Sequence, residues 1–239
     1  MKKKLLVLMI AILMVPGALL ADNVLKKVES FPILKSLFPP QVKVVGAKDL
    51  GDIYELVVQQ QQGTKRIYYT TKDGAYVLAG SLYNKDKINL TQVQMEKLNR
   101  VDVSTLPLKE ALKITKGNGA KELIMFADVD CPFCQRAYSW LKTQNNYTLY
   151  VFFYPLNIHP QSKGKTVAIL CSKDPLTSFE NAISGQAVGN ASCSAGTSLV
   201  EKEEALGNRV GVDGTPLFIT ASGDRIVGMD IPKLEAYLK

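Results

Sequence analysis

The period of the hydrophobic positions changes along the chain, and this change predicts two differently built halves. Apolar residues recur at helical spacing over residues 22–37, until Pro39 and Pro40 end the pattern. Short β-like runs follow at residues 42–45, 53–58, 66–70 and 76–82, with turn residues at 46, 63 and 73–74 between them. The first half is therefore predicted to be a helix followed by an antiparallel meander. Such a small α+β domain has a limited core, and pairing of an exposed strand edge with a second copy is a common remedy.

Residues 89–119 are predicted to form a linker between an N-terminal domain, residues 22–88, and a C-terminal domain, residues 120–239. A polar helix is expected over 91–100, where only a thin apolar stripe recurs. The glycines at 117 and 119 are expected to make a flexible joint.

Strands and helices alternate after residue 121. A buried strand at 122–127, a helix at 132–143 and a strand at 147–154 predict a βαβ unit with parallel neighbours and a right-handed crossover. Residues 161–210 are rich in helical pattern, a hairpin is expected at 217–220 and 225–229, and a helix at 232–238 closes the chain. This order is that of a thioredoxin fold with a helical insertion.

The N-terminus resembles a secretory signal peptide. Three lysines precede an apolar run over 5–15, and Pro16, Gly17 and small residues lead to a predicted cleavage after Ala21. The apolar run is short for a permanent membrane span, although an uncleaved anchor is the alternative. Residues 1–21 are therefore predicted to export the protein.

Removal of the three signal lysines leaves 29 − 3 = 26 basic against 22 acidic residues, a net charge of +4. This mild, scattered excess gives no support to nucleic-acid binding. The chain contains four cysteines, an even number that suits an oxidising compartment.

Cys131-Pro132-Phe133-Cys134 follows a buried strand and begins a helix, which predicts a redox-active dithiol. The N–H groups of a helix N-terminus stabilise a thiolate, so Cys131 is predicted to have a lowered pKa and to be the nucleophile. Pro132 suits the first helical position. Cys134, nearly one turn on and more enclosed, is the predicted resolving thiol.

A CxxC motif can also bind zinc or form a structural disulfide. Tetrahedral zinc requires two more ligands, and neither the distant Cys171 and Cys193 nor the single His159 provides a suitable partner motif. A structural disulfide is the second alternative, but a CxxC ring is strained and reducible. No metal and no cofactor is predicted.

Thr215-Pro216 precedes the strand at 217–220, and the pair is predicted to contain a cis peptide bond beside the dithiol. An ordinary trans proline is the alternative. Thr215 and Pro216, with Pro132 and Phe133, are the predicted substrate-binding residues. Cys171 and Cys193 are predicted to form a structural disulfide, although a second exchange-active pair is possible.

Two aspartates beside the motif and a histidine after the strand at 147–154 are the other polar candidates. His159 is predicted to be a surface histidine rather than a catalytic base. Asp128 and Asp130 could raise the pKa of the dithiol or relay protons, but Asp130 is predicted to cap the start of the helix instead.

Several segments together resemble the DsbC/DsbG family of periplasmic disulfide isomerases. They are residues 69–74 with Gly80, 128–134, 151–155, 168–174, 191–193, 206–207 and 214–216. The resemblance covers the chain from the start of the mature protein to the C-terminus.

The resemblance implies a periplasmic homodimer that pairs through small cystatin-like N-terminal domains, with linker helices between them and the thioredoxin-like domains. It also implies Cys131 attack on non-native disulfides, chaperone activity toward misfolded client proteins, and reduction by a membrane thiol reductase of the DsbD type. The main isomerase branch has Gly-Tyr between its cysteines, whereas Pro132-Phe133 is nearer the DsbG-like pattern, so the preferred substrate stays open. A DsbA-like dithiol oxidase and a holdase chaperone with an incidental dithiol are the rival functions.

Overall fold

The computed structural model describes residues 16–61 and 63–239, which form two compact units. The first contains the chain up to Gln60 together with residues 66–82, and the second contains residues 61–65 and 83–239. The predicted signal sequence lies outside the described residues, apart from 16–21, which begin helix α1. Among the described residues, no helix is both long enough and apolar enough to cross a bilayer.

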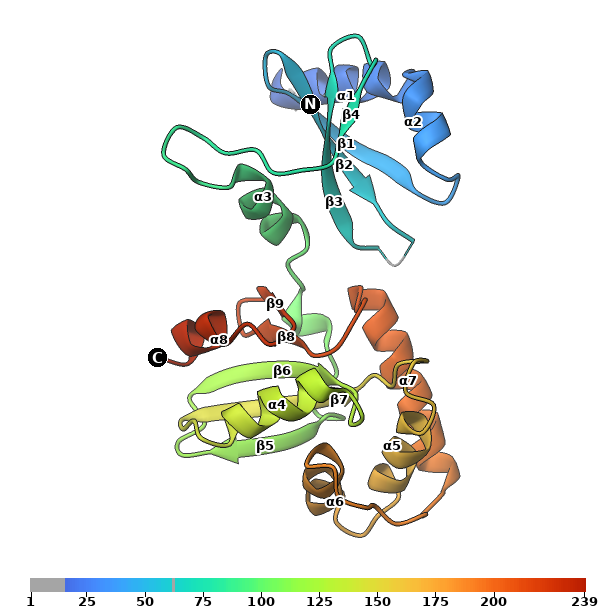
Figure 1. Ribbon diagram of the computed structural model, residues 1–239, viewed down its shortest axis with the longest axis vertical. Coiled ribbons are helices and arrows are strands. Elements are labelled where there is room, and N and C mark those ends of the chain that lie inside the picture. Colours follow the sequence, from blue (N-terminus) through green and yellow to red (C-terminus); the bar gives the residue numbers. More distant parts are fainter. Residues whose placement is uncertain (1–15, 62) are drawn as a thin grey trace, which may run out of the picture. The chain divides into compact units, whose positions relative to one another are not determined.

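The first unit is a small α+β domain, as the residue pattern predicted (Figure 1). Its elements are α1 (Pro16–Glu29), α2 (Pro32–Leu37), β1 (Lys43–Asp49), β2 (Ile53–Gln59), β3 (Lys65–Thr71) and β4 (Val77–Leu78). The strands form one sheet in the order β1-β2-β3-β4. Val28 and Leu34 from the helices pack with Leu56 and Val58 of β2 in its core.

Two expected elements of this unit differ from the structure. The helix predicted over 22–37 is two helices, because Phe31 before Pro32 is extended, with φ −67° and ψ 120°. The strand expected at 76–82 contains only Val77–Leu78, since its pairing with β3 stops at Tyr69–Leu78.

The second unit is built on a five-stranded sheet in the order β5-β7-β6-β8-β9. Its strands are β5 (Leu112–Lys116), β6 (Lys121–Ala127), β7 (Tyr147–Phe153), β8 (Leu217–Thr220) and β9 (Arg225–Val227). Its helices are α3 (Leu90–Leu98), α4 (Pro132–Leu141), α5 (Ser162–Leu170), α6 (Pro175–Ile183), α7 (Ser194–Val210) and α8 (Ile231–Leu238). Strands β6 and β7 are parallel, which confirms the predicted βαβ unit around α4.

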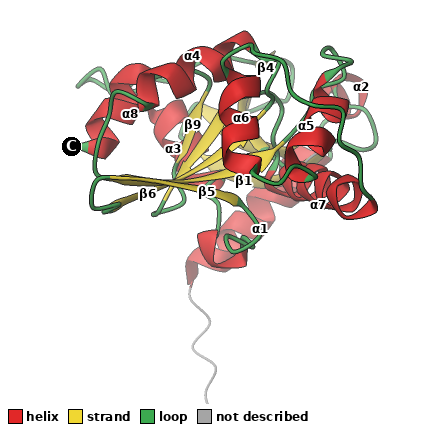
Figure 2. Ribbon diagram, turned by 90° about the horizontal axis from the view of Figure 1, so that it is seen from below, coloured by secondary structure: helices red, strands yellow, loops and turns green. Residues whose placement is uncertain are grey.

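The alternation of side chains along β6 supplies two cores, one on each face of this sheet. Leu123 and Met125 face a cluster that contains residues of α4, α6 and α8, whereas Ile124 and Phe126 face a cluster with Leu206 of α7. In Figure 2, α4, α6 and α8 lie on the same side of β5 and β6. These four residues of β6 are fully buried, so the strand that leads to the dithiol is rigidly held.

The predicted linker is shorter than residues 89–119, because β5 already belongs to the sheet of the second unit. Gly117 and Gly119 are not a flexible joint: their positive φ values, 59° and 66°, make the turn that leads from β5 toward β6. A Cβ on Gly117 would lie 2.5 Å from Oδ1 of Asn146, so side-chain packing requires glycine there. The predicted helix at 91–100 is α3, and Lys233 of α8 contacts its Glu96 at 3.1 Å.

Candidate active site

Cys131 is placed by the turn between β6 and α4, where it is the N-cap residue of the helix. Its backbone is extended, with φ −74° and ψ 119°, and its N–H donates to the carbonyl of Asp128 at 3.1 Å. Pro132 is the first helical residue, a position whose N–H would make no hydrogen bond within the helix, so its absence costs nothing. The thiol of Cys131 therefore lies beside the free N–H groups of the first helical turn.

The two thiols have opposite electrostatic environments. The pKa of Cys131 is lowered to about 5, first by the hydrogen bond from Cys134, and also by the side chain of Thr215 and the N–H groups of Phe133 and Cys134. These contacts outweigh burial, which acts in the other direction. The pKa of Cys134 is raised, first by burial and then by its contact with Cys131. Cys131 is therefore the thiolate at neutral pH, and Cys134 stays protonated.

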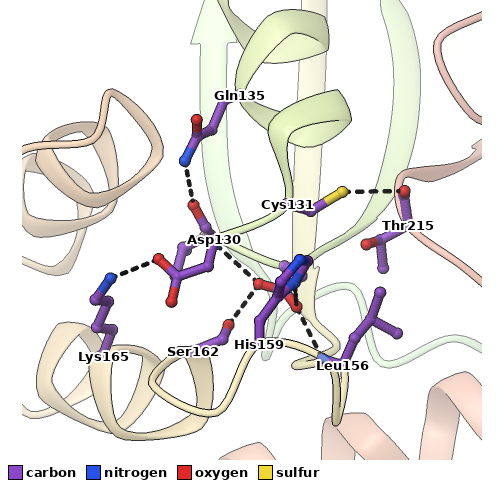
Figure 3. A network of polar contacts seen from close by, with 10 residues as sticks. Asp130, Cys131, Gln135, Leu156, His159, Ser162, Lys165 and Thr215 are labelled. Atoms are coloured by element: carbon purple, nitrogen blue, oxygen red, sulfur yellow. Dashed lines mark hydrogen bonds and ion pairs between the residues drawn. The ribbon is translucent and has the colours of Figure 1, made fainter.

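The two cysteines also differ in their exposure to solvent. The Cys131 residue is 4% exposed and Cys134 is fully buried, so an incoming disulfide can meet only Cys131. The Thr215–Pro216 peptide bond is cis, as predicted. Its Thr215 carbonyl lies 3.3 Å from Sγ of Cys131 (Figure 3).

Comparison with known proteins matches the two halves of the chain to two different families. Residues 21–92 match the family model of the disulfide bond isomerase protein N-terminal domain, and residues 108–239 match that of the thioredoxin-like domain. The chain belongs to the DsbC/DsbG family.

Curated members of the DsbC/DsbG family are similar over most of this chain. The probable thiol:disulfide interchange protein DsbC of Bordetella parapertussis is 33% identical over 72% of this chain and 61% of the relative. The thiol:disulfide interchange protein DsbC of Escherichia coli K12 is 25% identical over 70% of each. The chain therefore spans about three fifths of the length of the Bordetella relative that it matches.

A solved structure of a disulfide interchange protein from Neisseria gonorrhoeae also resembles this chain. The two are 28% identical with a TM-score of 0.51, over 56% of this chain and 96% of that one.

The turn that holds the dithiol of this DsbC/DsbG family member is organised by a buried carboxylate, that of Asp128. Asp128 is fully buried, and its oxygens receive hydrogen bonds from the N–H groups of Asp130 and Leu156, each at 2.8 Å. Ser162 Oγ donates to it at 2.5 Å, and His159 Nδ1 lies 2.7 Å away. One carboxylate thus joins the turn before α4 to the loop before α5.

Two assignments made from the sequence are wrong here. His159 is not a surface histidine, because its side chain is only 19% exposed and forms an ion pair with Asp128. Asp130 does not cap α4, since the N-cap is Cys131 and no side chain caps it. The carboxylate of Asp130 instead contacts Lys165 of α5 at 2.5 Å.

Cys171 and Cys193 form a disulfide, as predicted, and join the end of α5 to the start of α7. Gly196 packs against it so closely that an added Cβ would lie 2.4 Å from Sγ of Cys171. The disulfide lies within the helical insertion, apart from the dithiol, and belongs to the scaffold.

Glu203 of α7 is a second buried carboxylate, which the sequence pattern did not reveal. It is 3% exposed, and its Oε2 accepts the N–H of Phe153 at 2.7 Å, while Oε1 has no hydrogen-bond partner. Burial raises its pKa to about 8, against the hydrogen bond from Phe153 that lowers it. The one feature of the sequence that indicates burial of Glu203 is its position on the apolar face of α7, three residues before Leu206.

Apolar side chains are exposed close to the dithiol in sequence and after β7. Phe133 is 53% exposed, with the Arg136 guanidinium 4.7 Å from its ring centroid, and Ile158 is 77% exposed. Among the described residues, no group of three or more His, Cys, Asp or Glu side chains is arranged to hold a metal ion.

Proposed function

We propose that this protein is a periplasmic protein disulfide isomerase with reductase capability. The observation that carries the proposal is the asymmetry of the dithiol: Cys131 is the reachable thiolate, with a pKa of about 5, and Cys134 is a buried thiol. Stabilising the thiolate favours the reduced form of a dithiol, which is the form that attacks disulfides. The family membership of the chain supports the same chemistry.

The reaction begins with attack of the Cys131 thiolate on one sulfur of a wrong disulfide in a client protein. The client S–S bond breaks, a mixed disulfide with Cys131 forms, and the second client sulfur leaves as a thiolate that takes up a proton. If another client thiol then attacks the mixed disulfide, Cys131 is released unchanged and the client is isomerised. If Cys134 attacks instead, the client leaves reduced and the dithiol is oxidised by two electrons.

The client is held, in this proposal, by the edge of the active site around Cys131. The Thr215 and Pro216 backbone lies beside the sulfur and offers its polar groups to an extended chain, as Pro132 and Phe133 offer apolar surface. Misfolded proteins expose apolar segments, so an exposed ring such as that of Phe133 suits them. This surface would also give chaperone activity.

The family membership supports a proposal for the assembly and the partners. The first unit would pair with a second copy into a homodimer through its small sheet, consistent with its match to a disulfide isomerase N-terminal domain. A membrane thiol reductase of the DsbD type would return the oxidised dithiol to its reduced state. Light scattering of the mature protein at micromolar concentration should give the dimer mass, and a monomer mass would refute the dimer.

The test of the enzyme is the recovery of scrambled ribonuclease together with insulin reduction. Cys131→Ala should lose both activities, because no thiolate remains to attack. Cys134→Ala is the matched control: it should keep part of the isomerisation, in which a client thiol resolves the mixed disulfide, and lose net reduction. A Cys131→Ala protein that still rescued ribonuclease would contradict the proposal and leave a holdase chaperone.

The redox state of Cys131 and Cys134 in the intact compartment distinguishes an isomerase from a dithiol oxidase. Alkylation in whole cells should find Cys131 and Cys134 mostly reduced. A mostly oxidised pair would identify an oxidase instead.

A further inference from the structure

The loop between β7 and α5 brings His159 to the turn that carries the nucleophile. The carboxylate of Asp128 connects this loop to the turn before α4. It accepts a hydrogen bond from the N–H of Asp130 in the turn, and it contacts His159 and Ser162 in the loop. Figure 3 shows Asp130, His159, Ser162 and Lys165 gathered around the turn that leads to Cys131. The imidazole is therefore held by Asp128 at the turn that leads to Cys131, rather than free in solvent.

The Asp128 carboxylate favours a protonated imidazole. It is fully buried, and a buried carboxylate without a positive partner is costly. Its contact with Nδ1 of His159 raises the pKa of the histidine, opposed by burial. The negative charges of Asp128, Cys131 and Asp130 act in the same direction, while Lys165 is engaged with Asp130.

The interaction between two charges stabilises both of them equally. Cys131 raises the affinity of His159 for its proton, so the imidazolium must favour the thiolate of Cys131 by the same free energy. The same thiolate is stabilised first by the hydrogen bond from Cys134, and also by the side chain of Thr215 and the helix N-terminus.

We propose that His159, oriented by Asp128, is a positioning residue that stabilises the Cys131 thiolate, and that the two groups titrate as a coupled pair. The inference deepens the proposed function and rests on it only for its biological purpose. When Cys131 becomes part of a disulfide, the thiolate charge disappears and His159 binds its proton less tightly. Oxidation would then release a fraction of a proton from His159 to solvent near neutral pH.

The first test uses the fact that the chain has a single histidine. NMR titration of its ring signal follows His159 without assignment, in the reduced protein and in Cys131→Ser, whose hydroxyl stays neutral. The pKa of His159 should be lower in Cys131→Ser by roughly half to one unit, as expected for charges in a partly buried site. Equal pKa values in the two proteins would overturn the proposal.

The second test removes the imidazole and measures Cys131. In His159→Gln the thiolate absorbance titration should move upward by the same amount that His159 moved in the first test. If the Cys131 pKa rises from about 5 to about 6, the alkylation rate near pH 5 falls roughly three- to tenfold, and the rate near pH 8 changes little. That restriction to acidic pH separates an electrostatic role from general damage to the fold.

Two further variants control this experiment. Lys163→Gln removes one positive charge from the exposed side of α5, where Lys163 contacts Glu204, and should leave the Cys131 titration unchanged. His159→Lys keeps a cation in the loop and should recover part of the lost reactivity. The proposal fails if His159→Gln matches the wild type, or if Lys163→Gln has the same effect as His159→Gln. Since both readouts are pKa values of purified protein, either result leaves the isomerase proposal to be judged by its own assay.

Discussion

Replacement of Glu203 by Gln is expected to stabilise the protein in a pH-dependent way. The buried carboxyl has a pKa near 8, against an ordinary value of 4.5, because burial penalises its charged form. The folded protein thus keeps a proton that the unfolded chain releases, so stability falls as the pH rises from about 4.5 through about 8. At about 1.4 kcal/mol per pH unit, the full interval corresponds to on the order of 4 to 5 kcal/mol.

The amide introduced by Glu203→Gln keeps the shape of the side chain and the acceptor for the N–H of Phe153, but carries no charge. We therefore expect Glu203→Gln to equal the wild type near pH 4 and to exceed it by several kcal/mol above about pH 8. Urea unfolding of the full chain, followed by the fluorescence of its single tryptophan, Trp140 on α4, measures the difference in the second unit.

Glu204→Gln is the matched control, because it removes a carboxylate from the neighbouring position of α7. Its partner is Lys163, and a surface pair of this kind contributes at most about 1 kcal/mol. The reasoning is refuted if the difference between Glu203→Gln and wild type does not change with pH, or if the variant is the less stable protein at about pH 8.5.

Three further outcomes are expected. Replacing Cys171 and Cys193 together by Ala should lower the free energy of unfolding by about 3 kcal/mol, since the bond closes a loop over 22 residues; a loss below about 1 kcal/mol in denaturant titrations would contradict this. Asp128→Asn should cost more than about 2 kcal/mol in the same titrations, because a buried ion pair loses one charge, and an unchanged midpoint would show that the pair is not formed. Cys131 in the reduced protein should be alkylated at pH 6 roughly tenfold faster than an ordinary thiol, since a thiolate fraction about 300-fold larger is offset by lower nucleophilicity. If Cys131 were alkylated no faster than an ordinary thiol, its role as the nucleophile would be contradicted.

The position of the dithiol could be predicted from the sequence because its determinants are local. A buried strand, a turn and a helix that starts at Pro132 follow one another within a few residues, and the periodicity reports each of them. The cis bond before Pro216 could also be predicted, but only from the likeness to thioredoxin-like sites, which place a cis proline beside the dithiol.

The boundary of the linker was harder to predict for a physical reason. Strand β5 pairs with β7, and this pairing places residue 112 opposite residue 151, which is 39 positions further along the chain. A five-residue strand with a mixed pattern has no local signal strong enough to distinguish it from a loop. Gly117 and Gly119 gave the same turn signal that a flexible joint would give.

The contacts around the nucleophile could not be predicted from the sequence. Asp130 has the residue type and position of a helix cap, but the contact with Lys165 of α5 uses its carboxylate instead. His159 looks like a loop histidine at the surface, until the fold brings it to Asp128.

The sequence by itself determined the two-part architecture, the thioredoxin-like order of the second half and the cysteines that carry its chemistry. These features depend on periodicity, turn residues and spacing within one or two elements. Only the tertiary structure decided which carboxylates are buried and what they contact, because Asp128 meets His159 and Glu203 meets Phe153 across separations of 31 and 50 residues. The charge state of a buried group is set by neighbours that packing chooses, and no local pattern in the chain specifies them.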